Sequence, residues 1–214
     1  MEALLVLPRV AMSLMLDAAN GGVEICTLGL RPWWWRMRWD ALRLYPGGGI
    51  SIWLREAHHQ AQPMAQLSFG ETPVPCFLHM MRQIGATPDD LMVDLGCGRG
   101  LHLLAAVRVF GLRARGVDLL PGFISRGRTL AHGAAVEFVQ GDIESADLTG
   151  ATIVYIASTA FEPQVRAALA HRLLQLPPGT RIVTHDWALT GPRLLEERRY
   201  PLSWGWVDVR FYAL

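Results

Sequence analysis

The sequence predicts an α/β fold with a mostly parallel sheet, and two observations carry this prediction. From residue 68 onward, short apolar runs alternate with helical patterns, which is typical of βαβ units. One run, 151–157, is apolar and rich in β-branched residues, as expected of a parallel strand buried on both faces. The length of 214 residues suits one such domain with a modest extension.

Strands and helices can be placed along this part of the chain in order. Strands are expected at 91–95, 113–117, 135–139, 151–157, 180–184, 194–199 and 206–212. Helices are expected at 102–110, 122–132 and 162–176, the last ended by Pro177, Pro178 and Gly179. The strand at 206–212 alternates cleanly, so the last two strands predict an antiparallel hairpin at the end of the sheet.

Composition excludes several classes of function. Twenty basic and nineteen acidic residues give a formal charge of +1, so the broad basic surface of a dedicated nucleic-acid binder is not expected. All the basic residues are Arg, which excludes lysine Schiff-base chemistry such as aldolase-like or pyridoxal-phosphate catalysis. Three cysteines without C-x-x-C spacing predict neither a disulfide framework nor a cysteine zinc site, and a reducing cytoplasm is the expected location.

Membrane-spanning and metal-binding segments are not predicted either. No apolar run reaches the roughly 18 residues that a transmembrane helix needs, and the apolar N-terminus is interrupted by Glu2, Arg9 and Asp17. His58, His59 and His79 have no partner Cys or carboxylate at ligand spacing, so no metal site is expected.

The segment Asp94 to Gly100 runs from a strand through a glycine turn into a helix. Its glycines, Gly96, Gly98 and Gly100, allow a ligand to approach the backbone at a helix N-terminus. The spacing G-x-G-x-G differs from the dinucleotide pattern G-x-G-x-x-G, and Asp94 would repel a pyrophosphate but suits a ligand with an ammonium group. S-adenosylmethionine carries an ammonium, a carboxylate and a sulfonium and no phosphate, so it is the predicted cofactor.

Two further carboxylates follow the next two strands. Asp118 ends the second strand, where it can accept hydrogen bonds from both ribose hydroxyls. Asp142 follows the third strand and can accept from the adenine amino group, with Ile143 against the ring. Asp is also a common turn residue, but three acceptors at the carboxyl ends of successive strands predict one ligand site at that sheet edge.

Four local segments match one enzyme group. They are Phe69-Gly70-Glu71-Thr72, Asp94 to Gly100, residues 152–163, and Leu202-Ser203-Trp204. Over residues 68–214 the chain resembles the class I S-adenosylmethionine-dependent methyltransferases, and it is most similar to the non-SET lysine methyltransferases. That group includes the disruptor-of-telomeric-silencing histone enzymes and the ATP synthase c-subunit enzymes. The segments correspond to its Y-G-E-T, its D-L-G-S-G-V-G, its fourth strand with the following turn, and its V-S-W.

The resemblance implies a Rossmann-like, seven-stranded methyltransferase sheet that binds S-adenosylmethionine, with Phe69, Glu71 and Thr72 over the methionine end of the cofactor. It implies Glu71 and Ser158 as candidate catalytic residues, with Ser158 and Trp204 in the acceptor pocket. His185 is expected in the same pocket because it follows the fifth strand at that sheet edge. His185 and Asp186 could form a base with its orienting carboxylate, but neighbours on an extended chain point apart, which favours a capping role for Asp186.

The expected acceptor is a nitrogen of a protein side chain. Ala157 and Ser158 stand where the histone enzymes have consecutive Asn residues, and no basic tail is present, so histone methylation is not expected. The alternatives are a small metabolite or lipid-like acceptor, and a catalytically silent cofactor-binding domain. No nucleic-acid partner is expected.

Residues 1–67 are predicted to form a helical N-terminal extension, with turn-forming residues at 46–49 and a short helix at 50–62. The segment Trp33–Trp39 combines Trp with Arg. We expect a lid helix whose tryptophans cover the cofactor cleft while its arginines stay hydrated. The alternative is an interfacial membrane helix or an aromatic recognition surface, so that any membrane contact would be peripheral.

Overall fold

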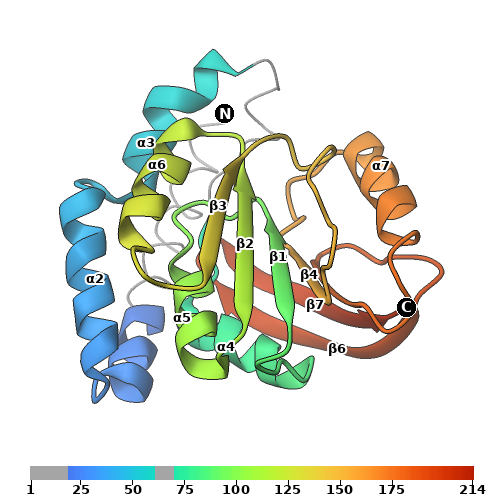
Figure 1. Ribbon diagram of the computed structural model, residues 1–214, viewed down its shortest axis with the longest axis horizontal. Coiled ribbons are helices and arrows are strands. Elements are labelled where there is room, and N and C mark those ends of the chain that lie inside the picture. The colour runs from blue at the N-terminus through green and yellow to red at the C-terminus, as the bar shows by residue number, and fades with distance from the viewer. Residues whose placement is uncertain (1–18, 61–69) are drawn as a thin grey trace, which may run out of the picture.

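The computed structural model describes residues 19–60 and 70–214, and its centre is a seven-stranded sheet in the order β3-β2-β1-β4-β5-β7-β6 (Figure 1). Five strands are parallel: β1 (Leu91–Leu95), β2 (Arg113–Asp118), β3 (Val136–Gln140), β4 (Ile153–Ile156) and β5 (Arg181–His185). The last two, β6 (Arg193–Leu202) and β7 (Gly205–Ala213), form an antiparallel hairpin that joins the sheet through β7. The predicted α/β class and the terminal hairpin are confirmed.

Three helices of the domain lie close to their predicted positions: α5 (Leu101–Phe110), α6 (Pro121–Leu130) and α7 (Pro163–Leu173). A fourth helix, α4 (Val74–Gln83), was not predicted. The N-terminal part contains helical residues 19–28, α2 (Pro32–Leu44), α3 (Gly48–Glu56) and the short 3-10 helix η1 (Ala57–His59). The predicted domain boundary at residue 68 falls within 61–69, outside the described residues.

Both faces of the parallel strands are buried, because alternate side chains enter two separate clusters. Met92 and Tyr155 pack on the side of α4, α5 and α6, whereas Val93 and Val154 pack on the side of α7. Figure 1 shows α5 and α6 on one side of the sheet and α7 on the other. This arrangement explains why the strand at β4 reads as continuously apolar.

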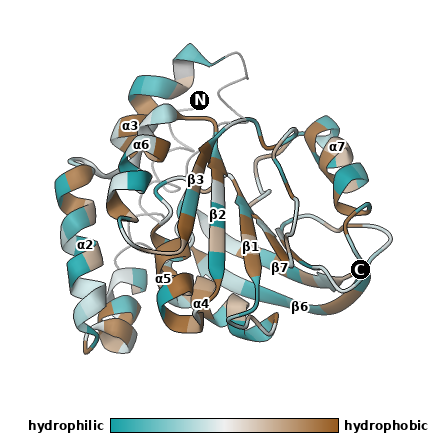
Figure 2. Ribbon diagram, viewed as in Figure 1, coloured by the Kyte–Doolittle hydropathy of each residue, from teal (hydrophilic) through white to brown (hydrophobic). Residues whose placement is uncertain are grey.

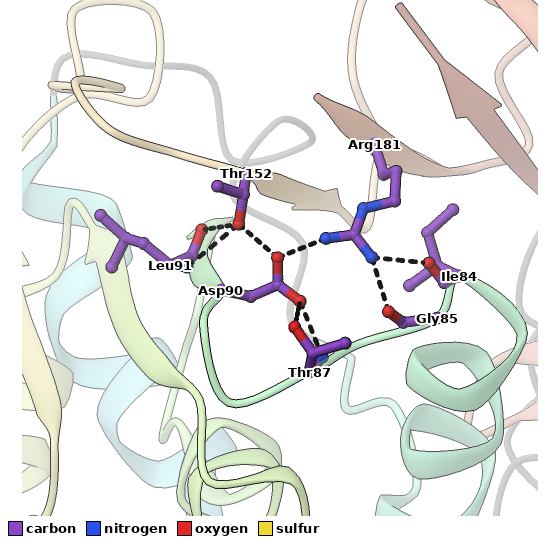
Figure 3. Close-up of polar contacts among 7 residues, drawn as sticks. All are labelled: Ile84, Gly85, Thr87, Asp90, Leu91, Thr152 and Arg181. Atoms are coloured by element: carbon purple, nitrogen blue, oxygen red, sulfur yellow. Dashed lines mark hydrogen bonds and ion pairs between the residues drawn. The ribbon is translucent and has the colours of Figure 1, made fainter. Parts of the chain in front are cut away.

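A polar network ties together the amino ends of β1, β4 and β5 (Figure 3). Asp90 forms an ion pair with Arg181, and it accepts hydrogen bonds from Thr152 Oγ1 at 2.7 Å and from the Thr87 backbone N–H at 2.7 Å. Arg181 also donates to two backbone carbonyls just after α4. Burial raises the pKa of Asp90, but the hydrogen bonds from Thr152 and Thr87 and the charge of Arg181 outweigh it, so the pKa is lowered.

The helix α2 lies at the outer edge of the molecule, against α6 and α5 (Figure 1). Trp34 and Met37 are buried in a third apolar cluster, while Trp35 and Trp39 are 52% and 58% exposed. In the part of the chain that the structure describes, no helix is long and apolar enough to cross a membrane.

Candidate active site

A cavity of about 310 Å³ lies at the carboxyl ends of the parallel strands. The loops after β1, β2, β3 and β4 line it, together with residues 70–72 and 204. Eight of the predicted site residues belong to its wall: Glu71, Thr72, Gly96, Gly98, Asp118, Asp142, Ile143 and Trp204. Phe69 lies outside the described residues.

The glycine loop forms the floor of this cavity. Gly96 has a φ of 96° and Gly98 a φ of 52°, a left-handed conformation that favours glycine. A β-carbon at Gly96 would meet no atom within 4 Å, so the loop leaves its surface open to a ligand. Gly100 does not line the cavity; a β-carbon there would come within 2.4 Å of the Phe138 ring, so close packing explains this glycine instead.

Asp118 connects the end of β2 to the glycine loop. One carboxylate oxygen accepts from the Gly98 N–H and the other from the Leu120 N–H, both at 2.9 Å. Burial raises the pKa of Asp118 to about 6 in spite of these two hydrogen bonds. The Asp142 carboxylate also accepts a hydrogen bond from a backbone N–H two residues later in the chain, that of Glu144 at 2.9 Å.

Asp94 is not itself part of the cavity wall, but it binds a histidine of that wall which was not predicted as a site residue. Its Oδ2 is 2.6 Å from His102 Nε2, and His102 lines the cavity. Asp94 is on the same face of β1 as Met92, toward α5, and His102 is in the first turn of α5. His102 and Arg108 are the two polar residues of α5, and the position of His102 in the first turn, next to the glycine loop, could have indicated its place in the site.

The second oxygen of Asp94 is unusual. Asp94 is 1% exposed, and within the described residues its Oδ1 is buried without a hydrogen-bond partner. Such an oxygen is costly unless a donor reaches it. A cationic group of a ligand in the cavity would supply that donor.

Glu71 is bound by an arginine of the glycine loop. Arg99 Nε donates to Glu71 Oε1 at 2.5 Å, and Arg99 Nη2 donates to Glu71 Oε2. The Arg99 guanidinium also lies 5.5 Å from the centre of the Tyr45 ring. Both carboxylate oxygens therefore already accept hydrogen bonds, which limits what Glu71 can accept from an incoming acceptor.

Two segments of the resemblance meet at the wall of the cavity. The Glu71 N–H donates to Ser203 Oγ at 3.1 Å, and a β-carbon at Gly70 would come within 2.4 Å of the Trp204 ring. Next to them, Thr72 Oγ1 and the Tyr155 hydroxyl form a buried hydrogen bond of 2.7 Å. Tyr155 is directly opposite Asp94 in the β1–β4 pairing.

The prediction that Ser158 and His185 line the pocket is wrong. Both are fully buried and absent from the cavity wall, because the Ser158 hydroxyl turns away and donates to the His185 carbonyl at 2.7 Å. Ala157 and Thr159 line the cavity instead. Burial lowers the pKa of His185 to about 3, so this ring is neutral. Asp186 Oδ1 accepts from the Asp208 N–H of β7 at 3.0 Å and does not pair with His185; this is a contact between strands and not a helix cap.

The prediction of a lid formed by Trp33–Trp39 is also wrong. None of these residues lines the cavity, because α2 packs against the outer side of α6 and α5. From residues 19–60, Trp53 of α3 reaches the cavity wall.

Comparisons with known proteins agree with this geometry. Residues 92–179 match the family described as "Methyltransferase domain". A solved structure of an RNA methyltransferase from Salinibacter ruber, in complex with S-adenosyl-L-homocysteine, matches this chain with 31% sequence identity and a TM-score of 0.56. The match covers 67% of this chain and 92% of the chain of that enzyme.

Two curated relatives have acceptors of different kinds in their names. A sterol 24-C-methyltransferase of Eremothecium gossypii is 29% identical over 52% of this chain, and the match spans only 32% of that enzyme. A protein-lysine N-methyltransferase of Saccharolobus islandicus is 28% identical over 56% of this chain and 76% of its own length.

Proposed function

We propose that this chain, which belongs to the class I S-adenosylmethionine-dependent methyltransferases, transfers a methyl group to a nitrogen of a protein side chain. Membership of the family rests on the 31% identity to the Salinibacter ruber enzyme, of which 92% is covered, and on the methyltransferase-domain match. The cofactor supplies a methyl group on a positively charged sulfur. The choice of acceptor is the part that we propose.

The residues of the cavity fit the cofactor. The unpartnered, buried Asp94 Oδ1 suits an ammonium group, and Gly96 leaves open space where a side chain would otherwise project. Asp118 would bind the ribose hydroxyls, and Asp142 the adenine amino group with Ile143 against the ring. All three line the same cavity as Gly96.

The observation that carries the proposed acceptor is the contact of residues 70–72 with residues 203–204. These are the two segments most specific to the resemblance with the lysine methyltransferases, and they are joined by the Glu71 to Ser203 hydrogen bond. The similarity to a protein-lysine N-methyltransferase over 76% of its length supports the same class of acceptor.

An amine acceptor arrives as an ammonium ion and must lose a proton before its lone pair can attack the methyl carbon. His102 is the side chain that we propose for this task, because it lines the cavity and Asp94 holds its Nε2 at 2.6 Å. That contact orients the ring and leaves Nδ1 as the nitrogen that the acceptor can reach. Glu71 would act as a positioning residue through Arg99, since Arg99 binds both of its oxygens.

A small or lipid-like acceptor is the second candidate. Trp53, Phe123 and Phe161 give the cavity a partly apolar wall, and the sterol methyltransferase is a relative over half of this chain. RNA is a third class to test, because the Salinibacter ruber relative is an RNA methyltransferase. The formal charge of +1 makes RNA the least favoured of the three.

The test is to incubate the full chain with methyl-labelled S-adenosylmethionine in a cell extract and to separate protein, RNA, lipid and small-molecule fractions. We expect label in protein, on a residue that amino-acid analysis identifies as an N-methylated side chain. Label confined to lipid, small molecules or RNA would reject the protein acceptor while leaving the methyltransferase activity intact. The Asp94→Ala variant is the control for label introduced by enzymes of the extract.

A further inference from the structure

The outer face of α2 carries an apolar stripe that no described part of the chain covers. Trp35, Trp39 and Leu42 are 52%, 58% and 67% exposed, and their spacing of four and three residues places them on one side of the helix. The opposite side of α2 is buried, through Trp34 and Met37. Figure 2 shows that α2, at the edge of the molecule, has hydrophobic as well as hydrophilic segments.

Arginines lie beside this stripe. Arg36 and Arg43 are exposed on α2, and the Arg43 guanidinium lies 5.1 Å from the centre of the Trp39 ring. Both arginines and His132 line a shallow hollow between α2 and the end of α6. The hollow contains one acidic side chain, Asp40, which is 3.9 Å from Arg36. Its cationic groups therefore outnumber its acidic ones.

The Trp35 side chain presents ring surface rather than a free hydrogen-bonding group. The Trp35 indole N–H donates to the Gly29 carbonyl at 2.7 Å, so this polar atom is already satisfied and the ring is held in place. An amphipathic element with tryptophans on one side and arginines next to them suits the boundary between lipid headgroups and acyl chains.

From this arrangement we infer that α2 docks the protein on a membrane surface that carries anionic headgroups. Trp35, Trp39 and Leu42 would enter the boundary of the acyl chains, and Arg36 and Arg43 would bind headgroup phosphates. A second copy of the chain fits less well. The three apolar side chains expose on the order of 300 to 400 Å², whereas a stable dimer buries about 800 Å² on each partner.

The experiment is co-sedimentation of the full chain with vesicles of phosphatidylcholine alone and of phosphatidylcholine mixed with phosphatidylglycerol, at low and high salt. We expect binding to the mixed vesicles that weakens as salt increases. The double variant Trp35→Ala/Trp39→Ala should lower the partition coefficient at least about tenfold. Trp206→Ala, which removes a tryptophan that is 59% exposed on β7, is the matched control and should bind like the natural chain.

A second set of variants tests the contribution of the α2 arginines to vesicle binding. Arg36→Gln/Arg43→Gln should weaken binding to anionic vesicles and reduce its salt dependence, while Arg199→Gln, an exposed arginine of β6, should not. Circular dichroism checks that each variant is folded. The inference is overturned if the natural chain does not bind anionic vesicles, or if the α2 variants bind as well as the controls. Self-association that the Trp35→Ala/Trp39→Ala variant abolishes, without vesicle binding, would assign the stripe to a second copy instead.

Discussion

Replacing Asp90 with asparagine should destabilise the fold without touching the cavity. Asp90 and Arg181 have side chains only 5% and 22% exposed, so the substitution leaves a mostly buried guanidinium without its counter-charge. Removal of one partner from a buried ion pair costs about 3 to 5 kcal/mol. Arg181 keeps its hydrogen bonds to two backbone carbonyls, and an amide oxygen can still accept from Thr152 or Thr87. We therefore expect a cost just below this range, about 2 to 3 kcal/mol.

The assay is equilibrium unfolding in urea at neutral pH. The midpoint should fall by about 1 M with an unchanged slope, because the surface exposed on unfolding stays the same. Asp89→Asn is the matched control: the neighbouring carboxylate is exposed, so its replacement should change the free energy of unfolding by less than about 0.5 kcal/mol. Cofactor affinity should be unchanged in both variants, because the network lies at the amino ends of the strands and the cavity at their carboxyl ends.

The stabilisation that Asp90 contributes should depend on pH. The folded protein lowers the pKa of Asp90, so the stabilisation is complete above the pKa of the unfolded chain, about 3.9, and is lost as pH falls through the lower folded value. The difference in stability between the natural chain and Asp90→Asn should therefore shrink below about pH 4. A loss smaller than about 1 kcal/mol at neutral pH, or a difference that stays constant down to pH 2, would refute this reasoning.

Four further predictions concern the cavity. Asp94→Ala and Asp118→Ala should each weaken S-adenosylmethionine binding by about 1 to 3 kcal/mol in calorimetry, and unchanged affinity in both would contradict the cofactor site. Affinity in the natural chain should fall as pH drops through about 6, where Asp118 takes up a proton, and titration calorimetry on Asp118→Asn should lose this step. His102→Gln should lower kcat far more than it changes cofactor affinity, and an unaltered pH–rate profile would remove His102 from the proton transfer. Glu71→Gln should reduce turnover more than cofactor affinity, and full turnover would reject its positioning role.

Local sequence patterns were enough to predict the strands and the sheet edge at which the cavity lies. The strand predicted at 91–95 coincides with β1, and 113–117 differs from β2 by one residue at its end. Apolar runs of strand length that are bounded by glycine and proline indicate buried parallel strands. Asp118 and Asp142 were predicted to share one edge because parallel strands end on the same side, and both line the cavity.

Tertiary structure alone decided which side chains meet. Glu71 and Arg99 are 28 residues apart, and only the packing of the segment before α4 against the glycine loop makes them an ion pair. Ser158 was predicted to face the cavity, but the direction of a side chain in a turn depends on the turn geometry and on its hydrogen-bond partner, here the carbonyl of His185. The tryptophans of α2 show the same limit. Composition predicted an amphipathic aromatic helix. Which of its rings are buried and which are exposed is decided by the packing of α2 against α6 and α5. The residue pattern of α2 alone does not determine that packing.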